Sequence, residues 1–277
     1  MQCNRRYYYE YVERLELDAP VGAALRMGRA FANTLEHRDL EHVAASYSEY
    51  DLSPAMEVEI VQVEELARAY FQRYTEWEPG TEREVEFNSP LLGRGFLDGV
   101  ITTGNGRIAV EDKLISKYHW TEASERALRI EMQTIAYFAA MREAGTPLTK
   151  LMRRATFKPT ITQRTKRQPE TLSEYRKRLA DDIAGEPNKY FKCYDLYRSD
   201  AELDAFIDQV AVINAQIGTS EHASEVIEQA AYPQNTHACS SFGGCAFLDL
   251  CRDGELALPK YRIKERSNRP PTGEVAE

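Results

Sequence analysis

The stretch that decides the fold spans positions 95–113 and reads GFLDGVITTGNGRIAVEDK. Two apolar-rich runs flank a Gly- and Asn-containing segment that favours a tight turn, so the stretch predicts a β-hairpin. If positions 104–105 form the loop, Asp98 faces Glu111 across the strands; if positions 105–106 form it, Asp98 faces Lys113. Because strand side chains alternate between faces, Asp98, Glu111 and Lys113 share one face in both registers.

Two carboxylates and a lysine on one sheet face have two interpretations. Oxygen ligands of this kind suit Mg²⁺ or Mn²⁺, and a neighbouring lysine can orient an attacking water or stabilise developing negative charge. The alternative is an exposed sheet face with a cross-strand ion pair, which is the commoner meaning of such residues on a hairpin.

Composition sets broad limits. The 277 residues are 43% hydrophobic and 29% charged, so a sizeable core can form. No apolar run approaches the ~20 residues of a membrane span, and the N-terminus lacks the apolar stretch of a secretion signal, which predicts a cytoplasmic protein without a membrane partner. The net charge of −9 argues against indiscriminate nucleic-acid binding, but a metal and a local basic groove can act on DNA within an acidic protein. Six basic residues do cluster: Arg153, Arg154, Lys158, Arg164, Lys166 and Arg167.

Periodicity and capping signals predict an α/β (α+β) chain with one domain over 1–264. Residues 1–80 should be helical, with helices over 3–17, 23–36, 42–48 and, capped by Ser53, up to 74. Residues 81–165 should hold the hairpin, a preceding strand over 83–88, a long helix over 122–144 and a strand over 150–161. Residues 166–264 should hold helices over 171–184 and 199–217 and a cysteine-rich loop, and 265–277 should be a flexible tail.

Asp98, the run Glu111-Asp112-Lys113, and Gln133 with Tyr137 resemble the PD-(D/E)XK nuclease superfamily, in its RecB-like branch. That branch places an Asp before a (D/E)-x-K strand and a Q-x-x-x-Y motif on the helix that follows. The resemblance implies a restriction-endonuclease-like core, metal binding by Asp98, Glu111 and the backbone carbonyl of Asp112, and a catalytic role for Lys113. Gln133 and Tyr137, on one helix face by their i, i+4 spacing, would hold the DNA backbone or steady the site.

One position departs from the family pattern. The segment 25–36, LRMGRAFANTLE, resembles the family's G-x-x-x-H-x-x-L-E helix, whose His normally ligates the metal. Here that position is Ala32, and His37 lies ~140° further round the helix, so the ligand role does not transfer to it. Glu36 is either an outer carboxylate of the site or a surface residue.

Three cysteines near the C-terminus, Cys239, Cys245 and Cys251, have C-x5-C-x5-C spacing, which is not a usual zinc pattern. An iron–sulfur cluster needs four thiolates and accepts irregular loop spacing, so its fourth ligand would be Cys3 or Cys193. Free thiols and a zinc site are the alternatives.

The segment 3–11, CNRRYYYEY, resembles the C-P-x-x-Y-Y-Y opening of iron–sulfur RecB-like nucleases, which include the AddB nuclease domain and CRISPR-associated exonucleases. The Tyr-Pro-Gln-Asn lead at 232–235 resembles the phage members of that group. The resemblance implies a 4Fe–4S cluster on Cys3, Cys239, Cys245 and Cys251, with a structural role.

The leading hypothesis is therefore a metal-dependent DNA nuclease, most simply an exonuclease on single strands or duplex ends. The family context is phage or bacterial DNA processing, recombination or repair, where a helicase partner and an oligomer are both compatible. The alternative is a DNA- or partner-binding module that keeps the fold and cluster without catalysis, which Ala32 favours. Residues 117–120, directly after the catalytic strand, either touch DNA or pack locally.

Overall fold

The computed structural model describes residues 3–75, 81–117, 120–227, 231–239 and 244–264. Contacts divide the chain into two compact units. The first, called here the core unit, comprises Val21–Ser89 and Arg94–Leu203; the second, called the cysteine unit, comprises Met1–Pro20, Pro90–Gly93 and Asp204–Glu277. That 1–264 forms one nuclease domain stays a prediction, and the expected tail lies outside the described residues.

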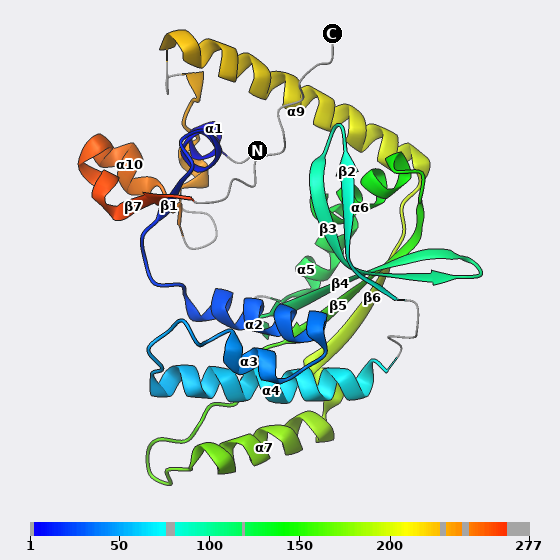
Figure 1. The fold of residues 1–277 in the computed structure, drawn as a ribbon, viewed down its shortest axis with the longest axis vertical. Helices are drawn as coiled ribbons and strands as arrows, with labels where there is room; N and C mark the ends of the chain where they lie inside the picture. The colour runs from blue at the N-terminus through cyan, green and yellow to red at the C-terminus, as the bar shows by residue number, and fades with distance from the viewer. Residues whose placement is uncertain (1–2, 76–80, 118–119, 228–230, 240–243, 265–277) are drawn as a thin grey trace. The chain divides into compact units, whose positions relative to one another are not determined.

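The core unit is built on a five-stranded sheet with the order β2-β3-β4-β5-β6 (Figure 1). Its strands are β2 (Glu82–Ser89), β3 (Gly93–Thr103), β4 (Gly106–Ile115), β5 (Leu148–Phe157) and β6 (Phe191–Leu196). β3 and β4 are antiparallel, β4 and β5 are parallel, and β6 is antiparallel to β5. Parallel neighbours require a long crossover, and helices between β4 and β5 supply it. The predicted fold, a small mixed sheet flanked by helices, is confirmed.

Helices α2 (Ala23–His37) and α4 (Pro54–Arg73) pack over one face of the sheet with α3 (Glu41–Ala45) beside them, and α7 (Leu172–Gly185) packs against α4 (Figure 1). Ser53 caps α4 as predicted, since its hydroxyl accepts a hydrogen bond from the Met56 N–H at 3.4 Å. Val110 of β4 is fully buried in this core. Because strand side chains alternate, Glu111 and Lys113 point to the opposite face.

The crossover on that opposite face consists of α5 (Glu122–Ala127), the 3₁₀ turn η3 (Leu128–Ile130) and α6 (Met132–Glu143). The prediction of one continuous helix over 122–144 is therefore wrong. The break falls at Glu131, whose backbone is extended (φ −66°, ψ 120°). Its carboxylate accepts hydrogen bonds from Arg153 at 3.1 Å and from Thr134 at 2.8 Å. This charge-assisted contact to β5 fixes the side chain at the point where the helix would otherwise continue.

The basic cluster of the sequence is divided between interior and surface. Arg153 and Arg154 lie on β5 with only 6% and 2% of their surface exposed. Arg164, Lys166 and Arg167 are exposed in the loop that follows β5. The cluster therefore does not form one basic groove.

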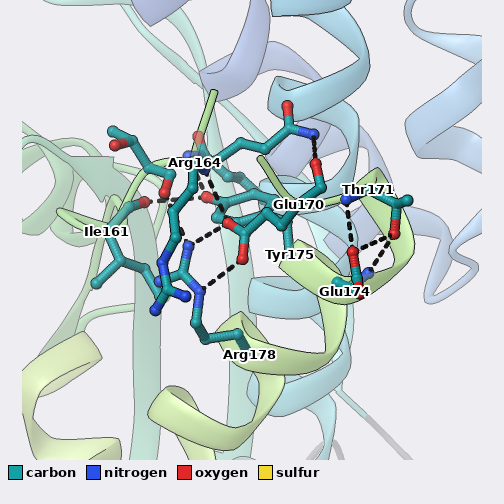
Figure 2. Close-up of polar contacts among 10 residues, drawn as sticks. Ile161, Arg164, Glu170, Thr171, Glu174, Tyr175 and Arg178 are labelled. Carbon is teal, nitrogen blue, oxygen red and sulfur yellow. Dashed lines mark hydrogen bonds and ion pairs between the residues drawn. The ribbon is translucent and has the colours of Figure 1, made fainter. Parts of the chain in front are cut away.

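Glu170 anchors that loop to α7 (Figure 2). It accepts hydrogen bonds from the backbone N–H of Arg164 at 2.9 Å and from the guanidinium of Arg178 at 3.1 Å. Next to it, Thr171 and Glu174 form a capping box at the start of α7, as Figure 2 also shows. The box satisfies backbone N–H groups that the first helical turn leaves unpaired.

The cysteine unit contains short elements and most of one long helix, α9 (Asp200–Ile227). The predicted N-terminal helix over 3–17 is right as far as Val12 and wrong beyond it: α1 (Asn4–Tyr7) continues as the π-helix η1 (Tyr8–Val12), and strand β1 (Leu15–Leu17) follows. β1 pairs antiparallel with β7 (Tyr261–Ile263), and this pairing holds the chain extended where local propensity favours helix. The remaining elements are η5 (Thr236–Ala238), α10 (Leu248–Asp253) and η7 (Gly254–Lys260). Among the described helices of the whole chain, none has the length and apolarity needed to cross a membrane.

Candidate active site

The hairpin register decides which residues face one another. β3 pairs with β4 so that Gly99 lies opposite Val110 and Thr103 opposite Gly106, which leaves positions 104–105 as the loop. Of the two registers that the sequence allows, the structure has the one that places Asp98 opposite Glu111. The Asp98 carboxylate accepts a hydrogen bond from the backbone N–H of Asp112 at 2.7 Å, so it lies against β4.

Glu111 is the most deeply placed acid of the hairpin. It is fully buried, at 0% exposure, and neither carboxyl oxygen has a hydrogen-bond partner of normal geometry among the described residues. Burial raises the pKa of this carboxyl from its ordinary 4.5 to about 7, and the charge of Asp98 adds to the rise, whereas Lys113 and Arg153 oppose it. A bound cation would favour the ionised form of this carboxyl.

Two cations sit beside Glu111. Lys113 forms an ion pair with it, and the lysine side chain is 37% exposed, so its ammonium group lies at the boundary between the buried acid and solvent. Arg153 lies opposite Glu111 in the β4–β5 register, with 3.7 Å between its guanidinium and the carboxylate. The sequence pattern did not assign Arg153 to the site; the available signal was a charged residue inside an apolar strand.

Gln133 and Tyr137 lie together on α6, as their spacing predicts. The Gln133 amide donates a hydrogen bond to the Tyr137 hydroxyl at 2.7 Å. Burial raises the pKa of Tyr137, and the charges of Glu111 and Asp98 raise it further, which locates its hydroxyl near both carboxylates. Phe87 packs edge-on against the Tyr137 ring at 5.9 Å. This packing requires Gly95, because any Cβ there would clash with the Phe87 ring.

Asp112 points to the other face of the sheet, toward α4. Its carboxylate accepts a hydrogen bond from the Tyr70 hydroxyl at 2.6 Å, and that hydroxyl in turn accepts one from Arg154 at 3.0 Å. Burial raises the pKa of Asp112 to about 6, although Tyr70 and Arg154 oppose the rise. The sequence pattern did not assign Tyr70 or Arg154 to this network; Tyr70 has the local pattern of a core residue, and Arg154 was noted only as part of the basic cluster.

This geometry agrees with a family match. The model of the PD-(D/E)XK nuclease superfamily matches residues 1–252. The chain belongs to the PD-(D/E)XK nuclease superfamily. Among solved structures, a protein from Eubacterium rectale described as a putative exonuclease is similar, with 13% identity, a TM-score of 0.48, and coverage of 90% of this chain and 78% of that chain. That similarity is too distant to bear on function, and no curated protein matches the chain significantly.

Ala32 of α2 stands where the resemblance to the RecB-like branch predicts a histidine. Ala32 does reach the site, because it lines a small pocket together with Glu36, Glu84 and Asp98. An alanine cannot ligate a metal, so this position offers the pocket no ligand. His37 does not replace it, since its ring stacks on His42 with 4.0 Å between centroids and its Nδ1 contacts the Asn33 carbonyl at 3.0 Å.

The four cysteines named for a cluster all belong to the cysteine unit, whereas Cys193 lies on β6 of the core unit. All five are free thiols. Burial raises the pKa of the Cys251 thiol, and the nearby Arg5 opposes this rise. Tyr8, Tyr9 and Phe247 pack around Cys245 and Cys251. Among the described residues, no three Cys, His, Asp or Glu side chains converge on a point that could hold a metal, so the cluster stays a prediction.

Proposed function

We propose that this PD-(D/E)XK protein is a metal-dependent deoxyribonuclease, acting as an exonuclease on single strands or duplex ends. The observation that carries the proposal is the Glu111 carboxyl, which is fully buried beside Asp98 with the Lys113 ammonium at its exposed edge. Burying an ion pair has a large desolvation cost and adds little net stability. A purely structural role therefore explains this arrangement poorly. Superfamily membership supports phosphodiester hydrolysis.

Mg²⁺ or Mn²⁺ is the proposed cofactor. Across the described ranges, no three Asp, Glu, His or Cys side chains surround one point. The proposed ligands are accordingly two carboxylates, of Asp98 and Glu111, the backbone carbonyl of Asp112, and water. Mg²⁺ commonly binds through one or two carboxylates while keeping several waters. The buried Glu111 oxygens, which lack hydrogen bonds of normal geometry among the described residues, have the hard-donor chemistry that such an ion needs.

Each remaining side chain has a role that follows from its position. The cation, when bound, would polarise the phosphate and lower the pKa of a water molecule. Lys113 is placed to orient the attacking water and to stabilise charge on the phosphate, because its ammonium is partly exposed beside Glu111. Tyr137, held by Gln133, would position the DNA backbone or fix the Glu111 carboxylate.

Digestion of end-labelled DNA tests this proposal. The wild-type chain should degrade single strands or duplex ends with Mn²⁺ or Mg²⁺ and should leave covalently closed circles intact. Lys113→Ala should lower the rate by about 10²- to 10⁴-fold, the usual contribution of a catalytic proton-transfer group. Lys177→Ala, an exposed lysine of α7, is the matched control and should cleave normally. No cleavage by the wild type across a range of metal concentrations would refute the proposal.

A second candidate is a DNA- or partner-binding module that keeps the fold without catalysis, and Ala32 is the observation that favours it. Metal-independent DNA binding with no cleavage by the wild type would establish this candidate. In either case we place the protein in phage or bacterial DNA processing, recombination or repair, in the cytoplasm, where a helicase partner or an oligomer fits.

We also propose that Cys3, Cys239, Cys245 and Cys251 hold a 4Fe–4S cluster. Four thiolates are the donor set that such a cluster needs, and Cys245 and Cys251 pack against the aromatic rings of the cysteine unit. Linking positions 3 and 251 would close a very long loop and so lower the conformational entropy of the unfolded chain. The proposed role of the cluster is therefore to stabilise the fold. Protein purified without oxygen should contain iron and absorb broadly in the visible region. Cys245→Ser should lose both properties and Cys193→Ser should keep them, whereas colourless wild type with stoichiometric zinc would contradict the assignment.

A further inference from the structure

A cavity of about 370 Å³ lies in the core unit, beside the carboxyl ends of the parallel strands β4 and β5. Its volume falls in the range of small-molecule sites, roughly 300–1,000 Å³. The wall contains two aromatic rings, Trp120 and Phe157, and three lysines, Lys117, Lys189 and Lys192. None of these residues has a role in the site described above.

The sheet register relates this cavity to the proposed catalytic lysine. Ala155 of β5 lies opposite Lys113 of β4 and also opposite Lys192 of β6. Residues opposite one another in a sheet point to the same face, so Lys113 and Lys192 are on one face, two strand spacings or about 10 Å apart. The cavity therefore opens on the sheet face that carries Glu111, within reach of a short stretch of nucleic-acid strand.

The aromatic wall is held in place by polar contacts. The Trp120 indole N–H donates to the Tyr194 hydroxyl at 3.1 Å and to Glu125 at 3.2 Å. The Trp120 ring packs against Phe157 with 6.0 Å between centroids and against Tyr194 with 5.8 Å. A fixed aromatic ring at the wall of a cavity is a stacking platform for a base.

The charge balance of the wall favours an anion. Two carboxylates, Glu122 and Glu125, also line the cavity. Glu125 is neutralised by Lys192 at 2.8 Å, and Glu122 is 83% exposed with Arg126 as its ion-pair partner at 3.4 Å. Lys189 is paired with Asp182 at 2.7 Å. This leaves the exposed Lys117 as the ammonium group best able to meet a phosphate.

We propose that this cavity binds one nucleotide of a single strand, with its base on Trp120 and its phosphate at Lys117, next to the phosphodiester that is cleaved. The inference rests on the proposed nuclease function for its place in the reaction, but the binding itself does not require catalysis. Base stacking of this kind is tolerant of sequence, so the cavity would position the strand without selecting a base.

Fluorescence of Trp120 tests the proposal in the full chain. Trp77→Phe leaves Trp120 as the sole tryptophan, since the sequence has two. A short oligothymidylate, titrated in EDTA so that no cleavage occurs, should quench this fluorescence. Adding Lys117→Ala should weaken binding and reduce the slope of log affinity against log salt by about 0.7, the value for one phosphate contact on a single strand. The matched control, Lys177→Ala on α7, should change neither quantity.

Two outcomes overturn the proposal: an absence of quenching, or equal losses from Lys117→Ala and Lys177→Ala. If the chain cleaves DNA but shows either outcome, the cavity assignment fails and the nuclease function stands. If oligothymidylate quenches Trp120 in the Lys117-dependent way but no DNA is cleaved, the cavity assignment stands and the nuclease function fails. In a cleaving chain, Lys117→Ala should raise KM for single strands more than it lowers kcat, because the lost contact is to a neighbouring phosphate and binds ground state and transition state alike.

Discussion

Replacing Glu111 by Gln should stabilise the metal-free protein at alkaline pH while removing its proposed activity. The reason is that Glu111 is fully buried, and burial together with the charge of Asp98 disfavours its ionised form. Gln has nearly the shape of the protonated acid and never ionises. The substitution therefore separates a residue kept for function from one kept for stability. If the ion pair of Glu111 stabilised the fold, Glu111→Gln would lower the unfolding free energy instead of raising it.

The magnitude follows from the two pKa values. The Glu111 pKa rises from 4.5 to about 7 on folding. One pKa unit corresponds to about 1.4 kcal/mol, so ionised Glu111 costs the folded state up to about 3 kcal/mol. Below pH 4.5 the group is protonated in both states and the cost is absent. The cost grows as pH rises between 4.5 and about 7 and is complete above that range. Glu111→Gln should thus match the wild type near pH 4 and exceed its unfolding free energy by about 3 kcal/mol at pH 8.

Urea unfolding at both pH values, in EDTA, measures this difference. Glu49→Gln, at an exposed position of the core unit, is the control and should change the unfolding free energy little at either pH. Mn²⁺ should then raise the Tm of the wild type and not that of Glu111→Gln, since binding to the native state stabilises it. Equal or lower stability of Glu111→Gln at pH 8 would refute the reasoning, because it would mean that the pairing with Lys113 and Arg153 outweighs the burial cost.

Three further substitutions follow from the same contacts. Ala32→His should increase Mn²⁺ affinity about tenfold by calorimetry, equivalent to about 1.4 kcal/mol, because it adds an imidazole to the pocket beside the site. The control Ala23→His, at the start of α2, should not change the affinity. No gain from Ala32→His would mean that α2 does not present that position to the metal. Tyr70→Phe should lower the unfolding free energy by about 1–3 kcal/mol in urea, since it removes the hydroxyl that Asp112 and Arg154 share, and an unchanged midpoint would contradict the network. Thr171→Ala should cost about 1 kcal/mol through loss of the α7 cap, which Thr171→Ser should largely restore.

Local chemistry explains why the hairpin could be predicted and its register could not. The Gly and Asn residues between two apolar runs are sufficient to specify a turn. Either of two dipeptides can occupy its tip, and the local sequence does not choose between them. The face shared by Asp98, Glu111 and Lys113 was predictable because it is independent of that choice.

Long-range contacts account for what the sequence did not reveal. The break at Glu131 contains no Gly or Pro and depends on an ion pair with Arg153 of β5 at 3.1 Å. Strand β6 likewise lacks a distinct local pattern, and its pairing with β5 is what makes it a strand. The role of Tyr70 also arises only when α4 packs on the sheet. In each case the deciding partner lies more than 20 positions away in the chain.

The two neighbouring acids of β4 differ in what their carboxyls contact, and the difference indicates which face of the sheet takes the cation. Asp112 is hydrogen-bonded by Tyr70 and lies near the positive charge of Arg154, so a cation there would break a 2.6 Å hydrogen bond and meet a like charge. Glu111 has no hydrogen bond of normal geometry among the described residues to lose; of the two cations beside it, Lys113 is 37% exposed and Arg153 is also paired with Glu131. Asp112→Asn should therefore keep the rise in Tm that Mn²⁺ causes, because it leaves the backbone carbonyl intact, whereas Asp98→Asn should lose that rise. Equal losses in the two variants would mean that the cation is held from both faces, and the assignment of Asp112 as an anchor for α4 would be wrong.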